Sequence, residues 1–189
     1  MKYLPMIGLL ILVSGGIATA AEIDQTTGLP ATRVDRVSLP NPTGDVLWDL
    51  THGVYLDYEP AGVFYNLASL LAAEGLPVAV TDQGVDNVDL SQYCVLVICI
   101  GSAYDSPYTA SEVEAISMFV ANGGGLLVMA DNGGTTAAEN LNPVTQSYGT
   151  TIVQETVAPL DLPFSDFAPH EIFNGVDELF YRAAGELVG

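Results

Sequence analysis

A histidine and an aspartate lie three residues apart in "DLTHG", at the end of the first strongly apolar segment after residue 44. Histidine titrates near neutral pH, and a carboxylate such as Asp49 can orient the ring of His52. This pair could therefore serve as a general base or as a ligand. The alternative, which is favoured, is that His52 hydrogen-bonds to backbone groups and holds its loop, because the other histidine, His170, is far along the chain.

A second polar group follows the apolar stretch "LLVMA" (126–130), where the chain reads Asp131, Asn132 and Gly133. The stretch is rich in glycine but lacks the G-K-[ST] ending of a phosphate-binding P-loop. Asp and Asn hydrogen-bond their own turns, and Gly permits positive φ angles. The pattern therefore predicts a sharp turn here, with no nucleophile in it.

The nucleophilic residue types have weak contexts elsewhere. Ser102 lies in "CIGSAYD", which does not match the G-x-S-x-G turn of serine hydrolases. Cys94 and Cys99 lie in "YCVLVICI", which reads as a strand; five residues at about 3.3 Å each separate them by about 16 Å, too far for a disulfide. We predict that both are thiols that pack as small apolar side chains.

The sequence offers little support for a metal site. Two histidines without H-E-x-x-H or paired C-x-x-C spacing argue against zinc. No D-x-[DN]-x-[DN]-G calcium loop is present either. The 23 acidic residues leave calcium binding by converging carboxylates as an alternative to no cofactor.

The charge of the chain excludes one class of partner. It carries 23 acidic residues against four Lys and Arg, a net charge of −19. Such a surface repels phosphate backbones, so nucleic acid is not an expected partner, and an anionic membrane is no better. The simplest interpretation of the negative charge is a hydrated acidic surface that keeps the protein soluble in a salty exterior.

Residues 1–21 have the order of a secretory signal peptide. Lys2 precedes an apolar run, 6–13, and small residues follow up to Ala21. The run is too short to span a bilayer, which takes about 20 residues. We therefore expect a secreted, periplasmic or extracellular protein that has no stable membrane anchor after cleavage.

Beyond the signal peptide, residues 22–44 are rich in Pro, Thr and Gly and read as a linker, and residues 45–189 as one domain. In this domain apolar strands alternate with amphipathic helices. Strands are predicted at 46–50, 77–82, 94–100, 126–130 and 150–155, with one more near 179–182. Helices are predicted at 60–74, after a capping box formed by Thr109 and Glu112, and from Asn142 with Pro143 in its first turn.

This alternation predicts an α/β three-layer sandwich around a mostly parallel, flavodoxin-like sheet. Ligands of such sheets lie beyond the carboxyl ends of the strands. The residues predicted to line a cleft there are Asp49, His52, Gly101, Ser102, Asp131, Asn132 and Gly133. Trp48, the only tryptophan, is predicted to lie in the core and not in this cleft.

Several segments, taken in order, resemble one superfamily. They are "VLWDLTHG", "LLAAEGLPVAV", the long stretch from "LSQYCVLVICIGSAYD" through "TASEVEAISMFVANGGGLLVMADNGG", and "HEIFNGVDELFYRAAGEL". Over about residues 45–187 the chain resembles the class I glutamine amidotransferase-like superfamily, and more closely its non-catalytic branch of exported domains, related to the domain of intraflagellar-transport and gliding-motility proteins.

The resemblance implies a scaffold without the glutaminase reaction. In that superfamily a cysteine occupies the turn after a central strand, where its thiolate attacks an amide and turn amides stabilise the oxyanion. Here that turn reads Asp131-Asn132-Gly133-Gly134. Members of the branch continue with further strands and a helix, so the resemblance also implies a domain that is shortened at its C-terminus.

The expected function is therefore a secreted, non-enzymatic module that binds an extracellular protein or a polysaccharide. The sugar suggestion follows from relatives of the superfamily alone. The alternative is an extracellular hydrolase, carbohydrate-related or metal-assisted, that uses Asp49, His52 and Asp131.

Overall fold

The structure, a computed structural model, describes residues 8–12, 45–54, 58–99, 106–130, 137–156, 162–164, 177, 179–181 and 185–188. Its centre is a sheet in which four strands run parallel in the order β5-β4-β2-β3. These strands are β2 (Asp45–Asp49), β3 (Val78–Thr81), β4 (Tyr93–Cys99) and β5 (Gly125–Ala130). The first strand along the domain is central and the chain winds outwards to both sides, so the flavodoxin-like α/β prediction is confirmed.

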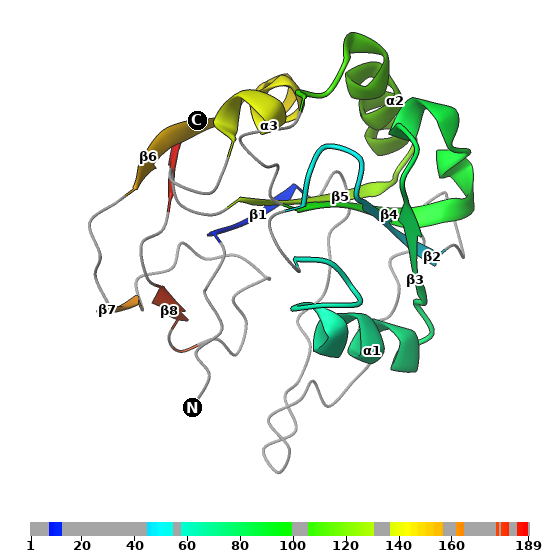
Figure 1. The fold of residues 1–189 in the computed structure, drawn as a ribbon, viewed down its shortest axis with the longest axis horizontal. Coiled ribbons are helices and arrows are strands. Elements are labelled where there is room, and N and C mark those ends of the chain that lie inside the picture. Colours follow the sequence, from blue (N-terminus) through cyan, green and yellow to red (C-terminus); the bar gives the residue numbers. More distant parts are fainter. Residues whose placement is uncertain are drawn as a thin grey trace.

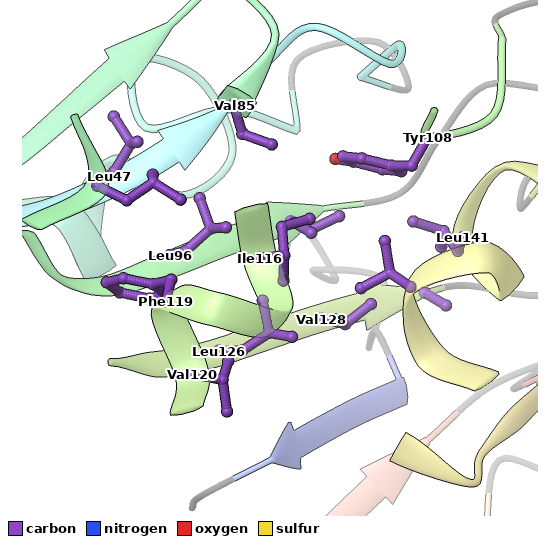
Figure 2. Packing of buried hydrophobic residues seen from close by; sticks show 14 of the residues in the cluster. Leu47, Val85, Leu96, Tyr108, Ile116, Phe119, Val120, Leu126, Val128 and Leu141 are labelled. Carbon is purple, nitrogen blue, oxygen red and sulfur yellow. The ribbon is translucent and has the colours of Figure 1, made fainter. Parts of the chain in front are cut away.

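Helices cover both faces of this sheet (Figure 1). α1 (Tyr65–Ala73) lies on one face, and α2 (Ala110–Ala121) and α3 (Ala138–Thr145) lie on the other. Each face has its own apolar cluster. Leu47, Leu96 and Leu126 pack with α2 and α3 (Figure 2), while the cluster on the α1 side contains Trp48 and Val97. Alternate residues along each strand thus reach opposite cores, as expected of strands buried on both faces.

Trp48 belongs to the core, as predicted. Its side chain is 0% exposed, and its ring centroid lies 5.1 Å from that of Phe64. Phe64 comes just before α1, because the helix begins at Tyr65 and not at residue 60, although Val63 and Phe64 still pack on the sheet. Within α1, Leu67 and Leu71 pack on the sheet, whereas Leu70 is 55% exposed.

α2 begins as predicted. The Thr109 side chain accepts a hydrogen bond from the backbone of Glu112, and the Glu112 side chain accepts one from the backbone of Thr109, so the capping box is complete. Ile116, Phe119 and Val120 form its buried stripe (Figure 2). The first turn of α2 lies near the carboxyl end of β2, because Glu112 contacts His52 there.

α3 begins earlier than predicted, and the predicted roles of two residues were wrong. The helix begins at Ala138, so Pro143 lies inside it and Asn142 does not cap it. The Asn142 side chain instead donates to the carbonyl of Ile152 and accepts from its amide, at 3.0 and 2.8 Å. Asn142 therefore joins the helix to the next strand, a long-range role that local sequence does not reveal.

The later strands do not join the main sheet. β6 (Thr151–Thr156) pairs antiparallel with β9 (Gly185–Val188), and β7 (Leu162–Phe164) pairs antiparallel with β8 (Leu179–Tyr181). The strands predicted at 150–155 and near 179–182 therefore exist, but in two small sheets of their own (Figure 1).

The fifth strand of the main sheet comes from the predicted signal peptide. β1 (Gly8–Leu12) pairs antiparallel with β5 along five residue pairs, from Gly8 opposite Ala130 to Leu12 opposite Leu126. From its sequence this segment was expected to be removed as a signal peptide, and no strand was predicted there. Within the described ranges, no helix has the length and apolar character needed to cross a membrane.

Cys94 and Cys99 are not joined by a disulfide, as their spacing along β4 predicted. Cys99 is buried in the cluster on the α1 side, and Cys94 is half-buried.

Candidate functional site

Four buried polar side chains meet beyond the carboxyl ends of β2 and β4. Asp49 ends β2, His52 follows in the next turn, Tyr108 precedes α2, and Glu112 lies in the first turn of that helix. Each is at most 8% exposed. Buried polar groups must find hydrogen-bond partners, so their contacts define what this network can do.

Asp49 holds its own turn and the segment before α2. Its Oδ1 accepts hydrogen bonds from the backbone amide of Thr51 at 2.8 Å and from the Thr51 hydroxyl at 2.6 Å. Its Oδ2 accepts a hydrogen bond from the Tyr108 hydroxyl, at 2.5 Å. Both carboxylate oxygens are thus directed at groups of the protein.

His52 links the same two segments. Its Nδ1 lies 2.9 Å from the carbonyl oxygen of Ser106, and its Nε2 lies 2.9 Å from Oε1 of Glu112. The ring of Tyr108 packs over the imidazole, with ring centroids 3.9 Å apart. The loop after β2 is therefore fixed to the start of α2 from three directions.

Glu112 caps α2 with one carboxylate oxygen and contacts His52 with the other. Its Oε2 accepts from the amide and from the hydroxyl of Thr109, both at 2.8 Å, while Oε1 faces His52. The loop after β3 lies against the same oxygen, because a Cβ atom added to Gly84 would stand 2.8 Å from Oε1. A larger residue at this position would therefore have to displace the Glu112 carboxylate from its place beside His52.

The pKa shifts follow from these contacts. Burial by itself lowers the pKa of His52, but the hydrogen bonds to Glu112 and to the Ser106 carbonyl, with the charges of Glu112 and Asp49, raise it above its ordinary value. Burial raises the pKa of Glu112, but its bonds to Thr109 and His52 outweigh this and lower it. Both shifts favour the charged forms, so the pair is an imidazolium and a carboxylate between the lowered pKa of Glu112 and the raised pKa of His52.

Tyr108 remains protonated in the same network. Burial, and then the charge of Asp49 and the hydrogen bond to it, raise the pKa of its phenol well above the ordinary value. The hydroxyl therefore acts as a donor to Asp49.

The protonation of His52 decides its chemistry. A carbonyl oxygen can only accept, so Nδ1 carries a proton, and the raised pKa of His52 favours a second proton on Nε2, which donates a hydrogen bond to the Glu112 carboxylate. A general base or a metal ligand needs a nitrogen lone pair, and in this arrangement the ring presents none. The geometry suits a charged clamp between loops.

The structure brings together two of the residues predicted to line a cleft, Asp49 and His52. Asp49 Oδ2 and the His52 ring are joined through Tyr108. The other predicted site residues, Gly101, Ser102, Asp131, Asn132 and Gly133, lie outside the described residues.

Sequence reasoning missed Glu112 and Tyr108 as members of this site. Glu112 was recognised only as half of a capping box. One signal was available: a helix that follows a parallel strand begins at the carboxyl edge of the sheet, so its first turn lies near the other strand ends. Nothing local marks Tyr108, since its partner is 59 residues away.

Metal-ligating side chains are dispersed among the described residues. No group of three or more His, Cys, Asp or Glu side chains converges there. A pocket of about 170 Å³ lies at the opposite end of β4, between η2 (Leu90–Gln92) and the end of α2. It is smaller than the 300–1,000 Å³ typical of ligand pockets.

No family model matches the chain. No curated protein matches it either.

Proposed function

We propose that this protein is a secreted, non-catalytic α/β module that binds a ligand or partner at the cell exterior. The observation that carries the proposal is the hydrogen bonding of His52, whose two ring nitrogens both face acceptor oxygens of the protein. Histidine is the residue on which a hydrolase at this edge of the sheet would depend.

The other polar groups of the network support the same proposal. Both oxygens of Asp49 and both oxygens of Glu112 accept hydrogen bonds from groups of the protein. A catalytic carboxylate needs at least one oxygen directed at a substrate or water. The resemblance to the non-catalytic branch of the glutamine amidotransferase-like superfamily, with Asp131 to Gly133 where the cysteine turn is expected, points the same way.

Charge restricts the ligand. Removal of residues 1–21 takes Lys2 away and leaves three arginines against 23 acidic residues, a net charge of −20. None of the arginines is among the described residues, where His52 is the only basic side chain. The ligand we propose is thus neutral or cationic, such as a neutral polysaccharide or a basic segment of an extracellular protein, and not a nucleic acid.

Binding is tested on the exported chain with neutral polysaccharides and basic peptides by titration calorimetry. We expect saturable binding that weakens at least tenfold in Asp131→Ala/Asn132→Ala, because these residues directly follow β5 in the sequence. The matched control is Asp82→Ala/Gln83→Ala, at the exit of the edge strand β3, which should bind as the unchanged protein does. Equal weakening in both pairs contradicts a site beside β5.

The hydrolase alternative is tested by a panel of ester, amide and glycoside substrates, with and without calcium or zinc. Hydrolysis by the unchanged protein that is lost in His52→Gln would overturn the proposal, provided that His52→Gln remains folded. Metal analysis of protein purified without chelators tests calcium binding separately. Thermal unfolding at increasing calcium concentration is the second test, since an ion bound to the folded state raises the unfolding temperature.

A further inference from the structure

The side of β5 that faces away from β4 depends on β1 for its backbone hydrogen bonds. One side of β5 pairs with β4, and the other pairs with β1, which belongs to the predicted signal peptide. If export removes residues 1–21, the backbone groups of β5 on that side lose their partner. An edge of this kind readily pairs with a strand of another chain.

β5 also lacks the usual protections of an edge strand. Its six residues, "GLLVMA", contain no charge and no proline, and Leu126, Val128 and Met129 are at most 3% exposed in the structure that includes β1. The opposite edge, β3, has four residues, with Pro77 just before it and Asp82 just after it. Short length, proline and charge all discourage edge pairing, so the two edges differ.

The strand that occupies the β5 edge indicates which partner fits. β1 reads "GLLIL" and β5 begins "GLLVM", so three of five positions are identical and the other two remain apolar. A second copy of the chain therefore offers, in its own β5, the kind of segment that pairs here. We infer that, once residues 1–21 are removed, two copies of this protein pair through β5 and continue one sheet across both molecules.

Orientation and register agree with a twofold dimer. Two identical strands related by a twofold axis must run antiparallel, and β1 is antiparallel to β5 although β4 is parallel to it. In such a pair, the residue at the twofold axis lies opposite the same residue of the other copy. In β5 this residue is Leu127 or Val128, at the middle of the strand. This register differs by one residue from that of β1, where Leu10 faces Val128. The shift is tolerated because β5 is apolar at every position on both faces.

The test compares the exported chain with uncleaved chain that is produced without export. Mass spectrometry determines the N-terminus of each. This inference rests on the export part of the proposed function and not on its ligand, so failed ligand binding leaves it intact. Sedimentation should show a doubled mass for cleaved protein, and a single mass for uncleaved protein. Dimerisation should strengthen with added salt, because each copy carries a net charge of −20.

Two lysine variants locate the interface. In the cleaved chain, Leu127→Lys should yield a monomer, while Val80→Lys, on the β3 edge at a residue 55% exposed, should leave the dimer unchanged. If Leu127→Lys does not fold, hydrogen exchange on the unsubstituted protein decides, because protection of the 125–130 amides should rise with protein concentration. An exported chain that keeps residues 1–21, a cleaved monomer at all concentrations, concentration-independent protection, or a dimer lost in Val80→Lys would each overturn the inference.

Discussion

Two turns of this protein have nearly the same local sequence and hydrogen bonds but different surroundings. In Asp49-Leu50-Thr51 the aspartate accepts from the backbone amide and the hydroxyl of Thr51, at 2.8 and 2.6 Å. In Asp89-Leu90-Ser91 the aspartate accepts from the same two groups of Ser91, at 3.2 and 2.6 Å. Asp89 is exposed and caps η2, whereas Asp49 is buried and also accepts from Tyr108.

The difference shows that the short motif forms the turn, while the fold decides how much the turn contributes to stability. Both aspartates satisfy local backbone groups, as aspartate commonly does two residues ahead. Only Asp49 holds a distant segment, in a place where water cannot replace a lost hydrogen bond. The cost of losing a partner is therefore much larger at the buried turn.

The largest effect is expected when the charge partner in the buried network is removed. Glu112→Ala leaves the His52 imidazolium without its carboxylate and opens the capping box of α2. We expect a loss of about 3–5 kcal/mol in the free energy of unfolding, as for a broken buried pair. Denaturant unfolding measures it. Glu114→Ala, exposed on the same helix, is the control and should cause no measurable loss.

The next effect tests the buried turn itself. Asp49→Ala leaves the buried Tyr108 hydroxyl and the Thr51 amide without their acceptor, which should cost about 1–3 kcal/mol for each group left unsatisfied. Adding Tyr108→Phe removes the orphaned hydroxyl and should make the second substitution less costly than it is alone. Strict additivity in this double-mutant cycle would show that the 2.5 Å contact contributes nothing.

A smaller effect is expected from pH. The raised pKa of His52 contributes stability that is complete below its ordinary value, near pH 6.5, and is lost as pH rises through the raised value. The lowered pKa of Glu112 contributes stability that is complete above its ordinary value, near pH 4.5, and is lost as pH falls through the lowered value.

The stabilising contribution of the pair should thus be largest between about pH 4.5 and 6.5. The measurement is the difference in unfolding free energy between the unchanged protein and His52→Gln, followed from pH 4 to 9, which cancels the repulsion among surface carboxylates. NMR titration of His52 gives its pKa directly. A midpoint below 6.5 would contradict the clamp.

The smallest effect completes the comparison of the two turns. Asp89→Ala removes a cap that is open to solvent, so water can replace the lost acceptor, and the loss should be well below that of Asp49→Ala. Thermal unfolding of the two single variants side by side provides the test. Equal losses would mean that burial does not distinguish the turns.

Much of the scaffold was predictable because its signals are local. Alternating apolar runs predicted the four parallel strands, and Thr109 with Glu112 predicted the start of α2. The start of α3 was predicted wrongly, because the Asn142 side chain bonds to Ile152, across ten residues, instead of capping the helix. Local capping preferences cannot register such a competing partner.

Of the site, only the features with local signals were predictable. The position of Asp49 and His52 at a strand end was readable, since parallel strands share one carboxyl edge. Their state was not, because it depends on Ser106 and Glu112, which lie 54 and 60 residues from His52 along the chain.

By itself the sequence determined the period of the strands and helices, the acidic charge and the turn at each aspartate, because these depend on neighbouring residues and on counts. Tertiary structure alone decided that one aspartate is buried, that the imidazole of His52 faces two acceptors, and that a segment near the N-terminus pairs with β5. Hydrogen-bond partners and exposure to water are properties of groups brought together by folding, and they set both the protonation of a side chain and the free energy of its contacts.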